Sequence, residues 1–378
     1  MLEVKQILMA KKKALVVHQQ IFGLEKIGGA EAVCVRSLEA LKDEFEVHFV
    51  VPYVGGLVKD VNLINKQYGS ELKSGDFVLM NVPLWNIVRP LVRWSWFLHT
   101  FVFMAMVRRL APKFDLCLST YNEFDFGPHK NARQYLHYPM LTVALTSVPR
   151  KIFAWITGFS YQNVLSAYSY TCSEYTRKLI QQKYPHTHID VLYAPVRKPR
   201  MEVPAHTTNK DFIYIGRISR EKRIEECIKI VEDVRKAGYN SKFTIVGPAY
   251  DEQYHNEILL AVKDKEWVTM YGQASSGEID TLMSAHGFGI NGTKDEQFGI
   301  TIAEMCRCGV LVFVPNGGGQ LEVVDNSLVF ENVDDAVSKI VKLFQNDEMQ
   351  AELRKRAIAT SDKFDAKNFI KQLNNSLQ

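Results

Sequence analysis

Cysteine is scarce in this sequence of 378 residues. There are six cysteines and no C-x-x-C pair among them, so neither a disulfide framework nor a zinc ribbon is indicated. Cys306 and Cys308 have no neighbouring histidine or second cysteine pair that would complete a tetrahedral metal site. The apolar neighbours of residues such as Cys34 and Cys117 favour reduced thiols in the core of a cytosolic protein.

Long apolar runs are also missing. The longest, at 94–107, is interrupted by three polar residues and is shorter than the roughly 20 residues that a membrane-spanning helix needs. Residues 1–13 end in three lysines, and no apolar segment with a cleavage site follows, which argues against a secretory leader. We therefore expect a cytoplasmic protein without a transmembrane helix.

Acidic residues are sparse in the first half of the chain. Residues 1–200 contain 25 Lys and Arg against 15 Asp and Glu, whereas residues 201–378 contain 21 against 27. The overall composition, 47% hydrophobic and 23% charged, is that of a soluble globular protein and excludes a disordered or fibrous chain. The basic half suggests an anionic partner, such as a membrane surface, a nucleic acid or a charged acceptor.

Short β-branched or aromatic runs alternate with helical patterns along the whole chain. This alternation predicts two doubly wound α/β domains with parallel sheets. A proline-punctuated basic stretch near residue 200 indicates a linker between an N-terminal domain at 1–200 and a C-terminal domain at 201–361. A helix at about 362–378 can pack back onto the first domain. Such sheets bind ligands outside the carboxyl ends of their strands, so we expect the site in a cleft between two facing domains.

Apolar residues alternate or run continuously in a strand and recur about every 3.6 residues in a helix, and these patterns locate the expected elements. The strands are expected at 13–18, 45–52, 116–120, 133–137, 168–173, 190–193, 211–215, 243–246, 268–271, 288–291 and 311–314. The helices are expected at 30–41, 225–237, 254–263, 277–285, 301–308, 334–345 and 349–360.

Two cations follow the first strand of the C-terminal half. Gly216 leaves that strand, and Arg217 and Lys222 lie in the loop before the next helix. Cations beside the free N–H groups of a helix N-terminus form a natural diphosphate site. An ordinary solvated loop also carries such residues, so this segment alone leaves both interpretations open.

Two carboxylates lie further along the chain, eight residues apart. Glu296 precedes Gly299, whose missing side chain lets the backbone approach a ligand closely. Glu304 falls about one turn inside a helix that Thr301 can start. Its sequence neighbours are apolar, and a carboxylate in such surroundings needs a partner. A solvated Glu296 before an ordinary helix start is the alternative.

A glycine pair, Gly28 and Gly29, opens the first helix after the first strand. It allows close backbone approach to an anion or a sugar, and a plain loop-to-helix turn explains it equally well. The G-x-G-x-x-G fingerprint is absent at this place, which argues against a nicotinamide-dependent dehydrogenase.

Together these segments resemble the retaining glycosyltransferases of family 4, which have the GT-B fold of two Rossmann-like domains facing across a cleft. The resemblance covers nearly the whole chain and is strongest between residues 211 and 325. It rests on G-R-x-x-x-x-K at 216–222, on E-x7-E at 296–304, on the glycine-rich run at 317–322 and on the N-terminal glycine pair, in the expected order.

The resemblance implies a role for each matching residue. Arg217 and Lys222 would hold the donor diphosphate, Glu304 would bind the ribose hydroxyls, and Glu296 would bind hydroxyls of the transferred sugar. His137 would point at the sugar from the N-terminal domain, although a hydrogen-bonded strand-end histidine is the alternative. The further donor-binding positions would act through their backbone: Gly28, Gly29, Gly216, Phe298, Gly299, Ile300 and Thr301.

The same resemblance implies transfer with retention, with no metal and no other cofactor. The protein need not supply a nucleophile, because the leaving phosphate is thought to take the acceptor's proton on the same face. Cations and helix N–H groups would stabilise the departing diphosphate. Binding both substrates in one cleft would align them.

Aromatic and cationic residues interleave in two N-terminal stretches, at 85–109 and 150–156. This mixture suits helices that lie on an anionic membrane leaflet. A buried amphipathic helix with snorkelling cations is the alternative. The residues that we expect to contribute are Arg89, Arg93, Trp94, Trp96, Phe97, Phe101, Phe103, Arg108, Arg109, Arg150, Lys151, Phe153 and Trp155.

The sequence therefore predicts a glycosyltransferase on the inner face of the cell membrane, with a UDP-sugar donor and a lipid-linked glycan or polysaccharide acceptor. The Leu-His-Tyr-Pro segment at 136–139 keeps a GDP-mannose-dependent mannosyltransferase open. A nucleotide-sugar epimerase and a basic nucleic-acid-binding protein are the alternatives from other classes. No nucleic-acid-binding module is recognised in the sequence, so we expect no nucleic-acid partner.

Overall fold

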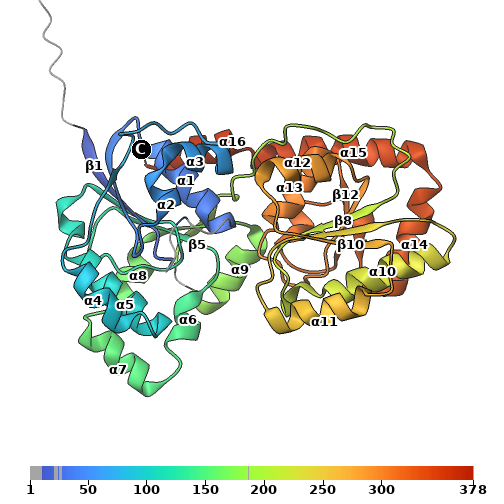
Figure 1. The fold of residues 1–378 in the computed structure, drawn as a ribbon. Helices are drawn as coiled ribbons and strands as arrows, with labels where there is room; N and C mark the ends of the chain where they lie inside the picture. The colour runs from blue at the N-terminus through green and yellow to red at the C-terminus, as the bar shows by residue number, and fades with distance from the viewer. Residues whose placement is uncertain (1–10, 21–23, 25–27, 186, 378) are drawn as a thin grey trace, which may run out of the picture. The chain divides into compact units, whose positions relative to one another are not determined.

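The computed structural model describes residues 11–20, 24, 28–185 and 187–377 (Figure 1). The first ten residues, where a leader was considered, lie outside this described part. The chain divides into two compact units. The N-terminal domain comprises residues up to 172, 177–192 and those from 369 onward, and the C-terminal domain comprises 173–176 and 193–368.

The N-terminal domain is built on a seven-stranded sheet in the order β3-β2-β1-β4-β5-β6-β7, with every neighbouring pair parallel. Its core joins β1 to helix α5 through buried Leu15, Val17 and Phe103. The strands are β1 Lys12–Val17, β2 Phe45–Val50, β3 Val78–Leu79, β4 Leu116–Ser119, β5 Ala132–Leu136, β6 Tyr168–Thr171 and β7 Ile189–Val191.

Helices connect these strands, and the last helix of the chain returns to this domain. In α16, Ser376 Oγ lies 2.6 Å from Tyr170 Oη on β6. The helices are α1 Gly29–Leu41, α2 Gly56–Lys59, α3 Val61–Tyr68, α4 Trp85–Val92, α5 Trp96–Arg108, α6 Met140–Ala144, α7 Val148–Ile156, α8 Tyr161–Ser166, α9 Glu174–Lys183 and α16 Ala366–Leu377.

The C-terminal domain has a six-stranded parallel sheet in the order β10-β9-β8-β11-β12-β13. Its central strands are almost entirely apolar, as expected of parallel strands covered on both faces. Four neighbouring strands each contribute one fully buried phenylalanine to the core: Phe212, Phe243, Phe288 and Phe313.

The elements of this domain follow the usual alternation of strand and helix. The strands are β8 Phe212–Ile215, β9 Phe243–Val246, β10 Val268–Gly272, β11 Phe288–Ile290, β12 Leu311–Pro315 and β13 Val329–Phe330. The helices are α10 Ile224–Lys236, α11 Glu252–Val262, α12 Ser276–Ser284, α13 Ile300–Cys308, α14 Val333–Phe344 and α15 Asp347–Ser361.

Each sheet has a topological switch point, where the strand order changes direction. It lies between β1 and β4 in the N-terminal sheet and between β8 and β11 in the C-terminal sheet. Loops that leave the carboxyl ends of two such strands diverge, and ligands of open α/β sheets bind there. We therefore expect a ligand-binding site among the residues that follow β1, β4, β8 and β11.

The predicted fold class of two doubly wound α/β domains is confirmed. The expected strands are present, but the two-residue edge strands β3 and β13 carry too short a pattern to be recognised in sequence. The helix expected from Thr301 is present and begins one residue earlier, at Ile300. Its N-cap is Gly299 in a left-handed conformation, so Thr301 does not cap it.

No helix in the described part of the chain is both long and apolar enough to cross a bilayer.

Candidate functional site

The loops that follow β8 and β11 touch at the switch point of the C-terminal sheet. A Cβ atom on Gly292 would lie 2.7 Å from the carbonyl oxygens of both Lys222 and Arg223. Only a residue without a side chain allows this approach. The glycine therefore brings the loop that carries Lys222 against the loop that carries Glu296.

Lys222 and Glu296 form an ion pair across these two loops. The Nζ atom of Lys222 lies 2.6 Å from Oε2 of Glu296. Both side chains are mostly but not wholly buried, with exposed fractions of 15% and 22%. The structure thus joins two residues for which the sequence predicted separate contacts, one with phosphate and one with sugar.

Arg217 lies in the same loop as Lys222 but has other contacts. Its guanidinium lies 4.5 Å from the centre of the Tyr250 ring and 3.8 Å from a carboxylate oxygen of Glu221. The Tyr214 hydroxyl donates a hydrogen bond to the Arg217 carbonyl, and a Cβ on Gly216 would clash with that hydroxyl at 2.7 Å. Gly216 thus shapes the backbone of this loop, and the half-exposed Arg217 side chain remains accessible.

The N-terminus of α13 follows directly after the Glu296 loop. Gly299 has a φ of +86°, and among the described residues no side chain caps the helix. The first N–H groups of a helix have no partner within the helix, so those of Ile300 and Thr301 can serve an anion. Phe298 contributes only backbone here, because its ring is buried against Phe364 at a centroid distance of 4.9 Å.

Glu304 is held by an arginine that the sequence analysis missed. Arg197 Nε lies 3.1 Å from Glu304 Oε1, and Arg197 Nη1 lies 2.6 Å from Asp280 Oδ1 on α12. Burial raises the pKa of the Glu304 carboxyl, and the charge of Arg197 opposes that rise. No sequence motif links these three residues, since Arg197 belongs to the basic linker and Asp280 to a different helix.

The glycine-rich run after β12 packs against the Glu296 loop. Cβ atoms on Gly317, Gly318 and Gly319 would each lie within 2.6 Å of a carbonyl oxygen between residues 294 and 297. Gln320, also missed in sequence, is fully buried behind this run. Its Nε2 donates to the Thr293 carbonyl at 2.8 Å, which ties the β11 and β12 loops together. The sequence feature that could have indicated Gln320 is its position directly after three glycines.

In the N-terminal domain, His137 lies beside the switch point between β1 and β4. Its Nε2 is 3.2 Å from the Thr120 carbonyl, so Nε2 carries the hydrogen and Nδ1 the lone pair. Burial lowers the pKa of His137 to about 4, which leaves the ring neutral at pH 7. His137 is therefore both hydrogen-bonded at a strand end, as the alternative proposed, and placed at a ligand-binding edge of its sheet.

His18 is a second histidine at this edge and was missed in sequence. Its Nδ1 lies 3.1 Å from the Thr120 hydroxyl. Burial and the neighbouring His137 lower the pKa of His18 to about 3. The position of His18, at the carboxyl end of the first expected strand, was the signal that could have indicated it.

The glycine pair has a local structural explanation. Gly28 is the N-cap of α1, and a Cβ there would lie 2.6 Å from Oε2 of Glu31 in the same helix. Gly28 is extended, as any residue can be at this position, and a side chain there would have to displace the Glu31 carboxylate. The residues at 25–27 that precede it lie outside the described part, so the donor contact expected of Gly28 and Gly29 stays a prediction.

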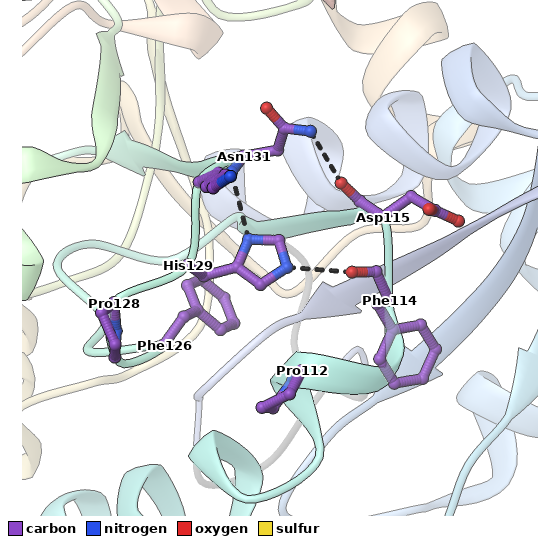
Figure 2. Close-up of a pocket in the computed structure, with 8 residues that line it drawn as sticks. Pro112, Phe114, Asp115, Phe126, Pro128, His129 and Asn131 are labelled. Atoms are coloured by element: carbon purple, nitrogen blue, oxygen red, sulfur yellow. Dashed lines mark hydrogen bonds between the residues drawn. The ribbon is translucent and has the colours of Figure 1, made fainter.

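A separate hollow of about 350 Å³ in the N-terminal domain does not belong to these edges. It lies at the amino ends of β4 and β5, where Figure 2 shows His129 between Phe114 and Asn131. The His129 ring uses both nitrogens, since Nε2 donates to the Phe114 carbonyl and Nδ1 accepts from the Asn131 N–H. Both ring nitrogens of His129 are thus bonded within the chain, which leaves neither for a ligand in this hollow.

Comparison with known proteins finds similarity to glycosyltransferases, and the family match lies in the C-terminal half of the chain. Residues 197–360 match the family model described as Glycosyl transferases group 1. The chain is 22% identical over 148 residues to alpha-monoglucosyldiacylglycerol synthase of Acholeplasma laidlawii, and 25% identical over 149 residues to GDP-Man:Man(3)GlcNAc(2)-PP-Dol alpha-1,2-mannosyltransferase of Dictyostelium discoideum. These matches cover 38% and 36% of this chain, but only 37% and 29% of the two relatives.

Solved structures resemble the chain over nearly its full length. HepE (Alr3699) of Anabaena, solved with UDP and glucose, superposes with a TM-score of 0.67 at 17% identity, covering 97% of this chain and 99% of the other. WaaG, described as a glycosyltransferase of lipopolysaccharide biosynthesis, gives a TM-score of 0.69 at 12% identity over 96% of this chain and 99% of the other. At these identities the likeness establishes the GT-B fold.

Proposed function

We propose that this protein is a retaining glycosyltransferase of family 4 that moves a hexose from a nucleotide-sugar to a lipid-linked glycan or polysaccharide acceptor. One observation carries the proposal. The loops after β8 and β11 join Lys222 to Glu296 directly before the N-terminus of α13, at the switch point of the domain that matches the group 1 model.

The proposed donor site combines the charges that such a substrate requires. Lys222, Arg217 and the first N–H groups of α13 supply positive potential for a diphosphate, and this potential matters most when the diphosphate departs. Glu296 and Glu304 supply acceptors for hydroxyl groups of the sugar and the ribose. Arg197 keeps Glu304 oriented and favours its charged form.

The proposed reaction needs no nucleophile from the protein and no metal. The bond from the sugar's anomeric carbon to the diphosphate oxygen breaks, and the acceptor oxygen bonds to that carbon on the same face. The acceptor's proton passes to the departing phosphate oxygen. The predicted contact of His137 with the sugar is part of this proposal, and a neutral ring suits hydrogen bonding to a hydroxyl.

UDP-sugars are the favoured donors, since HepE, a structural neighbour, was solved with UDP and glucose. GDP-mannose is the alternative donor, supported by the similarity to a GDP-mannose-dependent relative. A lipid-linked acceptor is supported by the similarity to a synthase whose name identifies a diacylglycerol product. Such an acceptor places the proposed enzyme on the inner face of the cell membrane.

A thermal-shift screen of the full chain against UDP-, GDP- and ADP-sugars tests the donor. A ligand that binds the native state raises the apparent stability, and one nucleotide class should do so more than the others. The Lys222→Ala variant should lose most of that shift. If no nucleotide-sugar changes the melting temperature, the proposed donor site is wrong.

Product analysis with and without a lipid-linked acceptor tests the reaction. A transferase consumes the donor productively only when the acceptor is present, and the glycosidic linkage keeps the donor's anomeric configuration. Conversion of the donor sugar without any acceptor would instead identify an epimerase. Inversion at the anomeric carbon would contradict the retaining reaction while leaving the transferase in place.

A further inference from the structure

Helix α7 presents an uncovered apolar stripe. Val148, Ile152, Trp155 and Ile156 stand at positions i, i+4, i+7 and i+8, which share one face of a helix. All four are more than half exposed, and Trp155 reaches 74%. Large apolar side chains that share a face and remain exposed indicate an interaction surface.

The segment around α4 presents a second stripe of the same kind. Ile87 and Leu91 lie one turn apart on α4, and Leu84 and Trp94 flank its two ends. All four are strongly exposed, at 75% for Leu91 and 81% for Trp94. The opposite side of α4 is anchored by Trp85, which is buried. The exposure of these residues therefore does not come from a loosely attached helix.

Helix α5 lies between the two stripes and holds both helices in place. The Trp85 ring of α4 lies 5.0 Å from the Phe103 ring of α5. The Phe97 ring of α5 lies 5.8 Å from the Phe153 ring of α7. Figure 1 shows α4, α5 and α7 gathered at one end of the N-terminal domain. The two stripes thus belong to one region, which we call the α4/α7 face.

The structure corrects which aromatic residues of the two stretches can meet a partner. Phe97, Phe101 and Phe103 were expected to contribute to a membrane-binding surface, but they are buried in the core. The stretch at 85–109 forms two helices, α4 and α5. The alternative of a buried amphipathic helix therefore holds for α5, whereas α4 and α7 expose their apolar residues.

Charge distinguishes the kind of partner. The chain contains no Asp or Glu between Asp76 and Asp115, or between Asp125 and Glu174, and these two segments include α4, α5 and α7. Arg93 lies over the Trp94 ring at 4.8 Å, and Lys151 is exposed next to the α7 stripe. Exposed tryptophans beside cations, without any acidic residue, match the headgroup region of an anionic leaflet.

Two of the expected cations have internal roles. Arg108 pairs with buried Asp125 and donates to the Gly158 carbonyl at 2.7 Å. Arg150 lies over the Phe97 ring at 5.5 Å, which fastens α7 to the core. Arg108 is therefore engaged within the domain, whereas Arg150 remains exposed. Arg93 and Lys151, which are exposed beside the two stripes, are the cations to test.

We propose that the α4/α7 face docks on an anionic lipid bilayer, with Trp94, Trp155 and the aliphatic residues of both stripes inserted at the headgroup level. This inference deepens the acceptor part of the proposed function and rests on it for the biological purpose of docking. Vesicle binding itself requires neither donor nor acceptor. The two proposals can therefore fail separately.

The test is flotation of the full chain with vesicles of phosphatidylcholine alone or mixed with phosphatidylglycerol. Binding to the mixed vesicles should be about tenfold stronger or more at low salt, and added salt should weaken but not abolish it. Lipids brominated in their acyl chains should quench tryptophan fluorescence, and Trp94→Phe with Trp155→Phe should remove most of the quenching.

The decisive variants change each component of the face by itself. Ile152→Ser with Leu91→Ser should weaken binding by about tenfold or more, and so should Arg93→Ser with Lys151→Ser. The matched controls lie in the C-terminal domain. Leu260→Ser removes a leucine of the same 75% exposure, Lys263→Ser with Lys355→Ser removes two exposed cations, and neither should change binding.

Three outcomes would overturn the inference. They are no binding to either vesicle, equal binding to both, and unchanged binding in the face variants. A concentration-dependent dimer in light scattering that the same variants abolish, without vesicle binding, would assign the face to a second copy of the chain. Because donor-induced thermal shifts are measured separately, loss of those shifts with intact vesicle binding would contradict only the proposed function.

Discussion

Lys222 and Glu296 stand 74 residues apart in the chain, and their charged atoms meet at 2.6 Å. Each comes from the loop after one of the two strands that flank the switch point of the C-terminal sheet. Removal of either partner leaves the other charge partly buried and unpaired, which is costly. The roles proposed for the two residues, in binding phosphate and sugar, are therefore energetically coupled.

Replacing Arg217 or Lys222 in the β8 loop should impair turnover much more than stability. Lys222→Ala and Arg217→Ala should each lower kcat/KM by about 100-fold, because both charges act on the diphosphate as it departs. Steady-state kinetics and melting temperatures measure the two effects. Arg220→Ala is the matched control, since this half-exposed arginine of the same loop pairs with Glu257. Wild-type turnover in either variant would make these cations ordinary surface charges.

Glu304→Gln should weaken donor binding by about tenfold or more, because a charge-assisted hydrogen bond contributes roughly 1.5–3 kcal/mol. Isothermal calorimetry with the donor found in the thermal-shift screen measures the loss. Asp280→Asn is the control, since it changes the other carboxylate that Arg197 contacts and should leave donor affinity nearly unchanged. Unchanged affinity in Glu304→Gln would remove this residue from the site.

Gly299→Ala should destabilise the protein and disturb the start of α13. A left-handed conformation costs a residue with a side chain about 1–2 kcal/mol, and here a Cβ would also lie 2.8 Å from Ile302 Cδ1. Gly272→Ala has a similar φ, and nothing lies within 4 Å of its Cβ. Denaturant unfolding of both variants separates strain from clash. Equal losses would mean that Ile302 moves aside.

Buried histidines of the N-terminal domain should make stability depend on pH, and besides His18 and His137 they include His99, whose pKa burial lowers to about 4. The pKa values of His18 and His137 lie near 3 and 4 in the folded protein, below the ordinary histidine value of 6.5. Between those pKa values and 6.5 the unfolded chain binds more protons, so this contribution is complete above pH 6.5 and is lost as the pH falls toward 4.

The variant His18→Gln isolates that contribution. It should cost more stability at pH 7 than at pH 5, because only the wild type loses its advantage on acidification. Denaturant unfolding at both pH values measures the difference. His129→Gln is the control, since it removes a histidine from the opposite edge of the same sheet. An equal cost at both pH values would mean that His18 is not held neutral.

The sequence by itself determined the two α/β domains and most of their strands. Apolar runs such as Leu311–Pro315 are legible without a structure, because a parallel strand covered on both faces must be apolar throughout. The motif residues Arg217, Lys222, Glu296 and Gly299 also stood out in sequence. Within each of the two motifs the residues are close in sequence, because each motif occupies the short loop between the end of a strand and the next helix.

The tertiary structure alone decided which of these residues meet. The pair Lys222–Glu296 depends on which strands are neighbours in a sheet, and sheet order is set by packing rather than by local sequence. The pair Arg197–Glu304 joins the linker to helix α13, which packing likewise decides. It also decided which cations face inward, as Arg108 does, and which face solvent, as Lys151 does. Arg108 and Lys151 are both cations in helices, so their local sequences do not distinguish an inward-facing from a solvent-facing side chain. Only the buried partner of Arg108, Asp125, distinguishes the two.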